Sequence, residues 1–189
     1  QWQGKTAPNL PCQLKIESNG QTREVVDTYS FAPILSDDEL HLFGEGNLNQ
    51  AYNTFGAHLV THQDVAGTRF AVWAPNAERV SVVGDFNQWD GRINPMRVRG
   101  STGVWELFIP HLEAATLYKF EIRNRHSHAI LTKTDPFARE FELRPGTAAK
   151  IAKPSQHKWQ DAAWLNQRAN HDWLHAPFNC YELHVGSWR

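Results

Sequence analysis

The sequence predicts a mainly β protein, an antiparallel immunoglobulin-like β-sandwich with short helical connectors. Between residues 67 and 150, short segments of alternating apolar and polar residues follow one another. Turn formers separate these segments at short, regular intervals, and no long helical pattern interrupts them. Strands of this length and spacing are typical of a sandwich of about 100 residues.

A β-hairpin is expected over residues 12–27. Leu14 and Ile16 alternate with charged residues, and Ser18-Asn19-Gly20 supplies the turn. Two strands alone cannot bury an apolar face. We therefore expect the hairpin to be the remnant of a second β module, which lies upstream of the sandwich.

Two short helices are expected in a connector over residues 36–58. Ser36 followed by Glu39 has the pattern of a capping box, and Gly44 is placed to end the first helix. A second helical run extends from Asn47 to Phe55.

The sandwich itself is assigned to residues 59–152. In an antiparallel strand, alternate residues share a face, so the apolar positions of each segment are expected to point into the core. Lys119 and Glu121 then project to the opposite face of their strand. The expected core positions are Phe70, Val72, Ala74, Val80, Val82, Gly84, Trp105, Leu107, Ile109, Tyr118, Phe120 and Ile122.

The last part of the chain has a different pattern. Residues 153–178 contain Trp159, Trp164 and Trp173, which suggests a connector that packs against neighbouring structure. Tyr181 to Val185 is a candidate strand. The chain also lacks an initiator Met and stops abruptly, so we expect it to be a piece of a longer protein.

The composition argues against several classes of partner. The net charge of the 189-residue chain is −1, which gives no long-range attraction to nucleic acid or anionic membranes. No apolar run approaches the length of a membrane span, about 20 residues, and no signal peptide is recognisable. The two cysteines form no disulfide framework, so a cytoplasmic protein is expected.

No catalytic or cofactor site is predicted. The sequence has no phosphate-binding loop, no nucleophile elbow and no recognisable pair of acid and base carboxylates. His126 and His128 lie close together, but a zinc site needs further ligands at fixed spacing. The two histidines are therefore interpreted as parts of a solvated turn, and no metal site is expected.

Trp89 is the candidate for ligand binding. It lies between turn formers in "VVGDFNQWDG", where an indole is exposed to water. If this turn folds over the outer face of the strand that carries Lys119, an indole and an ammonium flank one groove. The apolar C–H face of glucose can stack on the ring while its hydroxyls accept from the ammonium. The alternative is that Trp89 covers the open end of the core.

Three segments carry a resemblance to a known family. They are "GTRFAVWAPNAERVSVVGDFNQWDGRINPM", "GVWELFIP" and "LYKFEI…TKTDPFA", and they resemble the glycogen-binding β-sandwich module of the α-amylase superfamily. The closing "YELHVGSWR" resembles the first strand of a (β/α)₈ catalytic barrel. Together they resemble the N-terminal region of bacterial 1,4-α-glucan (glycogen) branching enzymes.

The resemblance implies a division of the chain. It also implies that residues from about 178 to 189 are poorly packed or held by a neighbouring molecule, with Leu183 and Val185 outside the sandwich. The implied parts are the remnant of a first N-terminal β module (1–35), a helical connector (36–58), the glycogen-binding module (59–152), a connector (153–178) and the first barrel strand (179–189).

The resemblance also implies a sugar site and a partner. Trp89 matches the first stacking tryptophan of the related module in the β subunit of AMP-activated kinase, Lys119 matches its lysine, and Thr147 matches its threonine. The second stacking tryptophan has no counterpart, because the corresponding turn carries His126 and His128. The implied partners are an α-glucan (glycogen, amylose or a maltooligosaccharide) and the chain's own catalytic barrel.

In this family an Asp nucleophile and a Glu acid act from later barrel strands, so no catalytic residue is expected here. Two alternatives remain: a stand-alone glucan-binding regulatory module, and a debranching or trehalose-forming relative. The stretch from Tyr181 to Arg189 favours a branching enzyme, since a binding module has no use for a barrel strand.

Overall fold

The computed structural model describes residues 11–18 and 20–187. The chain divides into two compact units, one that ends at Pro154 and one that begins at Ser155. Each unit is described by itself.

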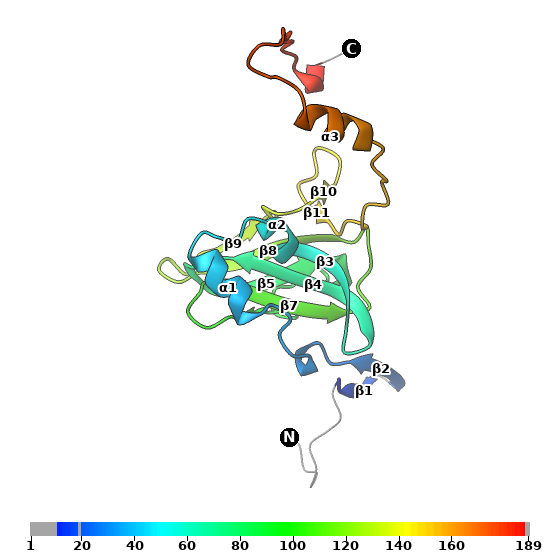
Figure 1. Ribbon diagram of the computed structural model, residues 1–189. Helices are drawn as coiled ribbons and strands as arrows, with labels where there is room; N and C mark the ends of the chain where they lie inside the picture. Colours follow the sequence, from blue (N-terminus) through cyan, green and yellow to red (C-terminus); the bar gives the residue numbers. More distant parts are fainter. Residues whose placement is uncertain (1–10, 19, 188–189) are drawn as a thin grey trace. The chain divides into compact units, whose positions relative to one another are not determined.

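The first unit contains two antiparallel sheets (Figure 1). One has the strand order β3-β4-β7-β6 and the other the order β10-β11-β8-β5, with β9 also paired to β8. The strands of the first sheet are β3 (Gly56–His62), β4 (Val65–Trp73), β7 (Val104–Pro110) and β6 (Arg97–Val98). Those of the second are β5 (Ala77–Gly84), β8 (Leu117–Asn124), β9 (Ile130–Lys133), β10 (Glu140–Phe141) and β11 (Ala149–Lys150).

The core lies between these two sheets, as the alternation predicts. Phe70 of β4 meets Tyr118 of β8 edge to face, with ring centroids 5.1 Å apart. Eleven of the twelve expected core positions are buried in the core or packed against it. The twelfth, Gly84, has no side chain, and its backbone is buried. The mainly β, antiparallel sandwich is therefore confirmed.

The core also contains a buried carboxyl group. The Tyr118 hydroxyl donates to Asp135 Oδ2 at 2.6 Å, and the Phe137 N–H donates to Asp135 Oδ1 at 2.8 Å. Burial raises the pKa of Asp135 above its usual range. Burial, with Asp135 close by, also raises the pKa of Tyr118, so its hydroxyl remains a donor.

The outer face of the first sheet is buried as well, which the alternation in β4 does not indicate. Ala71 and Val104 are fully buried there against Leu35, Leu40 and Phe55. These covering residues come from the segment before β3, which includes α1 (Asp37–Gly44) and α2 (Ala51–Thr54). Figure 1 shows both helices on the side of this sheet.

The capping box of α1 is confirmed. The Ser36 hydroxyl accepts from the Glu39 N–H, while the Glu39 carboxylate accepts from the Ser36 N–H. The second helix is shorter than expected, because α2 spans only Ala51–Thr54 and has no side-chain cap. The chain then enters β3 at Gly56, whose φ of +94° suits glycine.

A buried ion pair fastens the segment before α1 to the first sheet. Glu106 on β7 is only 4 % exposed. Its Oε1 accepts from the backbone N–H groups of Ile34 (2.6 Å) and Leu35 (2.9 Å). Arg99 donates to Glu106 Oε2 at 2.6 Å and to the Leu35 carbonyl at 2.7 Å. One carboxylate and one guanidinium thus hold the backbone that leads into α1.

The N-terminal hairpin is also confirmed. Strands β1 (Gln13–Ser18) and β2 (Gln21–Val26) pair antiparallel, and Gly20 has a φ of +75°. A 3-10 turn (Thr28–Ser30) follows them. The idea that this hairpin is a remnant of a second module stays a prediction.

The second unit has little regular structure. Helix α3 (Ala162–Ala169) and a 3-10 turn (Val185–Ser187) are its elements. The expected strand from Tyr181 to Val185 is not formed, since strands are completed by hydrogen bonds to neighbours and no strand of the described chain pairs with these residues. Leu183 and Val185 are exposed, as expected. The described residues include no helix long and apolar enough to cross a membrane.

Candidate functional site

The outer face of the second sheet carries the expected site. Lys119 and Glu121 alternate with the buried Tyr118 and Phe120 along β8, so they point away from the core as predicted. The chain that leaves β5 folds back over this face. A Cβ placed on Gly91 would lie 2.1 Å from Glu121 Oε1, which shows how closely the turn approaches the sheet.

Asn87 organises this turn. It is buried, and its side-chain oxygen accepts from the Gly84 N–H at 3.0 Å. Its amide nitrogen donates at 2.8 Å to the Val82 carbonyl and at 2.8 Å to the Asn94 side chain. Because all three bonds tie the turn to β5 or to itself, Asn87 fixes the backbone on which the next residues stand.

Trp89 follows in an unusual backbone conformation. Gln88 and Trp89 both have positive φ values, 57° and 60°. The left-handed conformation costs a residue with a Cβ about 1–2 kcal/mol, and a bulky residue there is an outlier. Such strain persists where the surroundings impose it, and it is concentrated at functional sites. The Trp89 N–H donates to the Gly84 carbonyl at 2.9 Å, which closes the turn.

The Trp89 side chain is exposed, as expected. It is 38 % exposed, and its Nε1–H donates to Asp85 Oδ1 at 2.7 Å. From this turn it is Phe86, rather than Trp89, that packs against the core. The structure therefore argues against a role for Trp89 as the cover of the core.

Lys119 and Thr147 lie in contact. Lys119 Nζ donates to the Thr147 hydroxyl at 2.6 Å. Thr134, which follows β9, donates from its hydroxyl to the Thr147 carbonyl at 2.5 Å. Strands β9 and β11 both pair with β8 along the same edge, and this shared edge brings Thr134 and Thr147 to Lys119.

Trp89 belongs to the same end of the β5–β8 pair. Its backbone is bonded to Gly84, and Gly84 lies opposite Tyr118, the neighbour of Lys119. Among the described residues, no hydrogen bond or ring contact joins Trp89 to Lys119 or Thr147. Of the three predicted residues, Lys119 and Thr147 are therefore bonded to each other, and Trp89 is not bonded to either.

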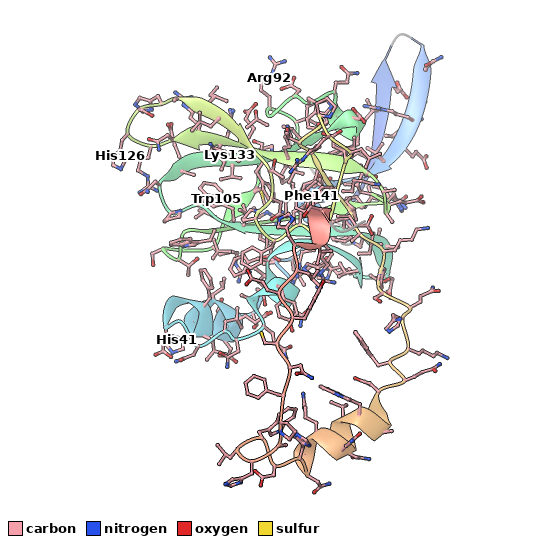
Figure 2. All side chains as sticks on the ribbon, turned by 90° about the horizontal axis from the view of Figure 1, so that it is seen from above. His41, Arg92, Trp105, His126, Lys133 and Phe141 are labelled. Carbon is pink, nitrogen blue, oxygen red and sulfur yellow. The ribbon has the colours of Figure 1, made fainter. Side chains whose placement is uncertain are left out.

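The turn between β8 and β9 carries imidazoles where the resemblance would place a second tryptophan. Figure 2 shows His126 at the tip of this turn. His128 Nδ1 lies 3.0 Å from Glu78 Oε2, and this contact lowers the pKa of Glu78. Both histidines are exposed. The turn therefore offers polar groups and no second large ring.

Ion pairs stand beside the site on the same face. Arg79 donates to Glu121 at 2.6 Å. Asp90, directly after Trp89, is held by Arg92, whose hydrogen bonds lower the pKa of Asp90 to about 2. Within the part of the chain that the structure describes, no group of three His, Cys, Asp or Glu side chains could hold a metal ion.

Sequence reasoning missed three residues of the site: Asp85, Asn87 and Thr134. Asp85 and Asn87 lie within the ten residues that drew attention to Trp89, and Asx side chains often bond within tight turns. That turn chemistry was the available signal. No sequence signal indicated Thr134, because its bond to Thr147 depends on where β9 and β11 pair with β8.

Residues 54–138 match the family described as Carbohydrate-binding module 48 (Isoamylase N-terminal domain). The chain is 61 % identical over its full length to a 1,4-alpha-glucan branching enzyme of Methylobacillus flagellatus, and 54 % identical to one of Nitrosospira multiformis. It spans 26 % of the length of each relative. A pullulanase of Klebsiella pneumoniae, solved with maltotriose, matches 52 % of this chain and 9 % of its own with 21 % identity and a TM-score of 0.43.

Proposed function

We propose that this chain is the N-terminal, glucan-binding part of a 1,4-α-glucan branching enzyme, which forms α-1,6 branch points in glycogen. Identity of 61 % over the whole chain to a protein of that name supports the proposal, as does the carbohydrate-binding family match. Named branching enzymes match the full chain, which favours this function over a stand-alone module and over a debranching or trehalose-forming relative.

The observation that carries glucan binding is the exposed Trp89 on a strained turn. A glucose unit can place its C–H face on the indole. On the same end of the β5–β8 pair, Lys119 Nζ has three donors, of which Thr147 accepts one. The Thr147 hydroxyl accepts that bond and keeps its own hydrogen for a sugar oxygen. Ring and donors together suit a neutral polyhydroxylated chain.

The site is expected to be weak by itself. It offers one ring, and the β8–β9 turn offers imidazoles. Stacking of a flat ligand on one aromatic side chain is worth about 1–3 kcal/mol, as judged from nucleic-acid bases. A polymer that engages several weak sites still binds well, because each later contact is intramolecular. We therefore propose that the function of the module is to keep the glucan bound near a catalytic barrel.

We assign the rest of the chain in the same way. Residues 1–35 are the remnant of a first β module, and residues 153–178 connect to the barrel. Residues 179–189 are its first strand, which forms only when its neighbours are present. The exposed Trp159, Trp164 and Trp173 then pack on the barrel. Glycogen is stored in the cytoplasm, where we place the protein.

Trp89→Ala is expected to weaken binding of maltoheptaose about tenfold, since the stacking ring of the proposed site is lost. The free energy of unfolding should change by less than about 1 kcal/mol, because no core residue is removed. Binding is measured by titration calorimetry and stability by urea unfolding. Trp164→Ala is the matched control, since Trp164 is also exposed, at 54 %, and belongs to α3 in the second unit, outside the proposed site. Unchanged binding in Trp89→Ala would contradict the proposed site.

The 189-residue chain is expected to have no branching, hydrolytic or transferase activity on amylose. Retaining glycosidase chemistry needs two carboxylates about 5–5.5 Å apart, and the proposal assigns both to the barrel. New α-1,6 linkages are measured after incubation with amylose, with the Methylobacillus flagellatus enzyme as positive control. Linkages formed by the purified chain would show that catalytic residues lie within it.

A further inference from the structure

The bond between Trp89 and Asp85 is distinct from the bonds that shape the turn. The turn backbone is closed by Trp89 N–H to Gly84 and by Gln88 N–H to the Asp85 carbonyl, at 2.9 and 3.2 Å. Its buried side-chain support comes from Asn87. The Asp85 carboxylate is exposed and takes part in none of these bonds. Its Oδ1 accepts instead from the indole Nε1–H of Trp89, at 2.7 Å.

This bond has two consequences for the indole. An exposed tryptophan on a turn samples several rotamers, and a bond at the far end of the side chain selects one of them. The bond also occupies the only donor of the ring. Trp89 therefore presents its faces in a fixed plane, and hydrogen bonds to a ligand must come from other residues such as Lys119.

We propose that Asp85 is a positioning residue, which holds the indole of Trp89 in the orientation that binds a glucan before the ligand arrives. The inference rests on the proposed glucan site. A ring that is already ordered loses no rotamer freedom on binding. The entropic cost of immobilising one side chain corresponds to about a threefold to tenfold difference in affinity.

The test compares two substitutions of Asp85 in the 189-residue chain. Asp85→Ala removes the acceptor, whereas Asp85→Asn keeps an oxygen that accepts from the indole. We expect Asp85→Ala to bind maltoheptaose about threefold to tenfold more weakly than the wild type, and Asp85→Asn to bind within about twofold of it. Both should unfold at the wild-type urea concentration, since Asn87 holds the turn.

A second measurement reads the mobility of the indole in the wild-type chain. The indole N–H of Trp89 gives one nitrogen-15 signal, assigned from its loss in Trp89→Phe. The proposal requires this group to be as rigid as the neighbouring backbone in the free wild-type chain. If the nitrogen-15 relaxation of this signal shows an indole N–H that is more mobile than the neighbouring backbone, the positioning role is wrong.

The binding results separate the two ideas. If Trp89→Ala weakens binding but Asp85→Ala does not, the positioning role is wrong and the glucan site stands. If Asp85→Asn binds as weakly as Asp85→Ala, the carboxylate acts through its charge or on the sugar directly, which also overturns positioning. If Trp89→Ala leaves binding unchanged, the proposed site itself fails.

Discussion

Glu106→Ala is expected to lower the free energy of unfolding by about 3–5 kcal/mol. Glu106 is almost fully buried, and Arg99 beside it is largely so. Removing the carboxylate leaves the guanidinium charged, buried and without its main partner. It also removes the acceptor of the Ile34 and Leu35 N–H groups. Domains of this size have only about 5–15 kcal/mol of stability in total, so the variant should unfold at a much lower urea concentration.

Asp37→Ala is the matched control for this prediction. Asp37 pairs with the same Arg99 at 3.2 Å, but its side chain is 98 % exposed. Water replaces an exposed partner readily, so this variant should unfold like the wild type. If Glu106→Ala were no less stable than Asp37→Ala, the buried pair would not be what fastens the segment before α1.

Tyr118→Phe is expected to cost about 2–4 kcal/mol although it removes a single oxygen atom. The hydroxyl is the donor to the buried Asp135. A hydrogen bond to a charged group contributes about 1.5–3 kcal/mol, and a buried acceptor left without its donor costs more. Urea unfolding at neutral pH measures the loss. Tyr29→Phe is the control, because its hydroxyl bonds the Ile93 and Pro95 carbonyls at the surface, and it should cost less than about 1 kcal/mol.

The loss in Tyr118→Phe should depend on pH. The folded-state pKa of Asp135 is raised by burial, so its protonation favours the folded state below the unfolded pKa. That stabilisation is lost as the pH rises through the folded pKa. Without the Tyr118 donor the ionised form is less favourable still. The variant should therefore differ least from the wild type at acid pH and most at neutral pH, and the opposite trend would show that the hydroxyl does not stabilise the ionised carboxyl.

The elements that the sequence predicted well are those with local signals. The capping box at Ser36, the hairpin turn at Gly20 and the inward apolar positions of β5, β7 and β8 each depend on neighbouring residues. The strand β3 was missed because its apolar positions are interleaved with His58 and His62, and its place is decided by pairing with β4. The burial of β4 on both faces was missed for the same reason, since the cover over Ala71 includes Leu40 of α1, which is distant in the sequence.

The candidate site divides in the same way. Exposure of Trp89 and the outward phase of Lys119 followed from turn chemistry and strand alternation. The place of Thr147 in the site came from the resemblance alone, and its bond to Lys119 was not predicted, because 28 positions separate the two residues. The left-handed backbone at Gln88 and Trp89 had no signal, since neither residue type favours it. Tertiary contacts impose it, and sequence patterns do not record them.

The ion pair at Glu106 also bears on where this module can be excised from a longer protein. The family match begins at residue 54, inside the end of α2. A fragment cut there lacks Leu35 and Leu40, so Ala71 and Val104 lose part of their cover. It also leaves Glu106 and Arg99 without the backbone groups that complete their shell. We therefore expect a fragment that folds by itself to begin upstream of Ile34, outside the matched family range.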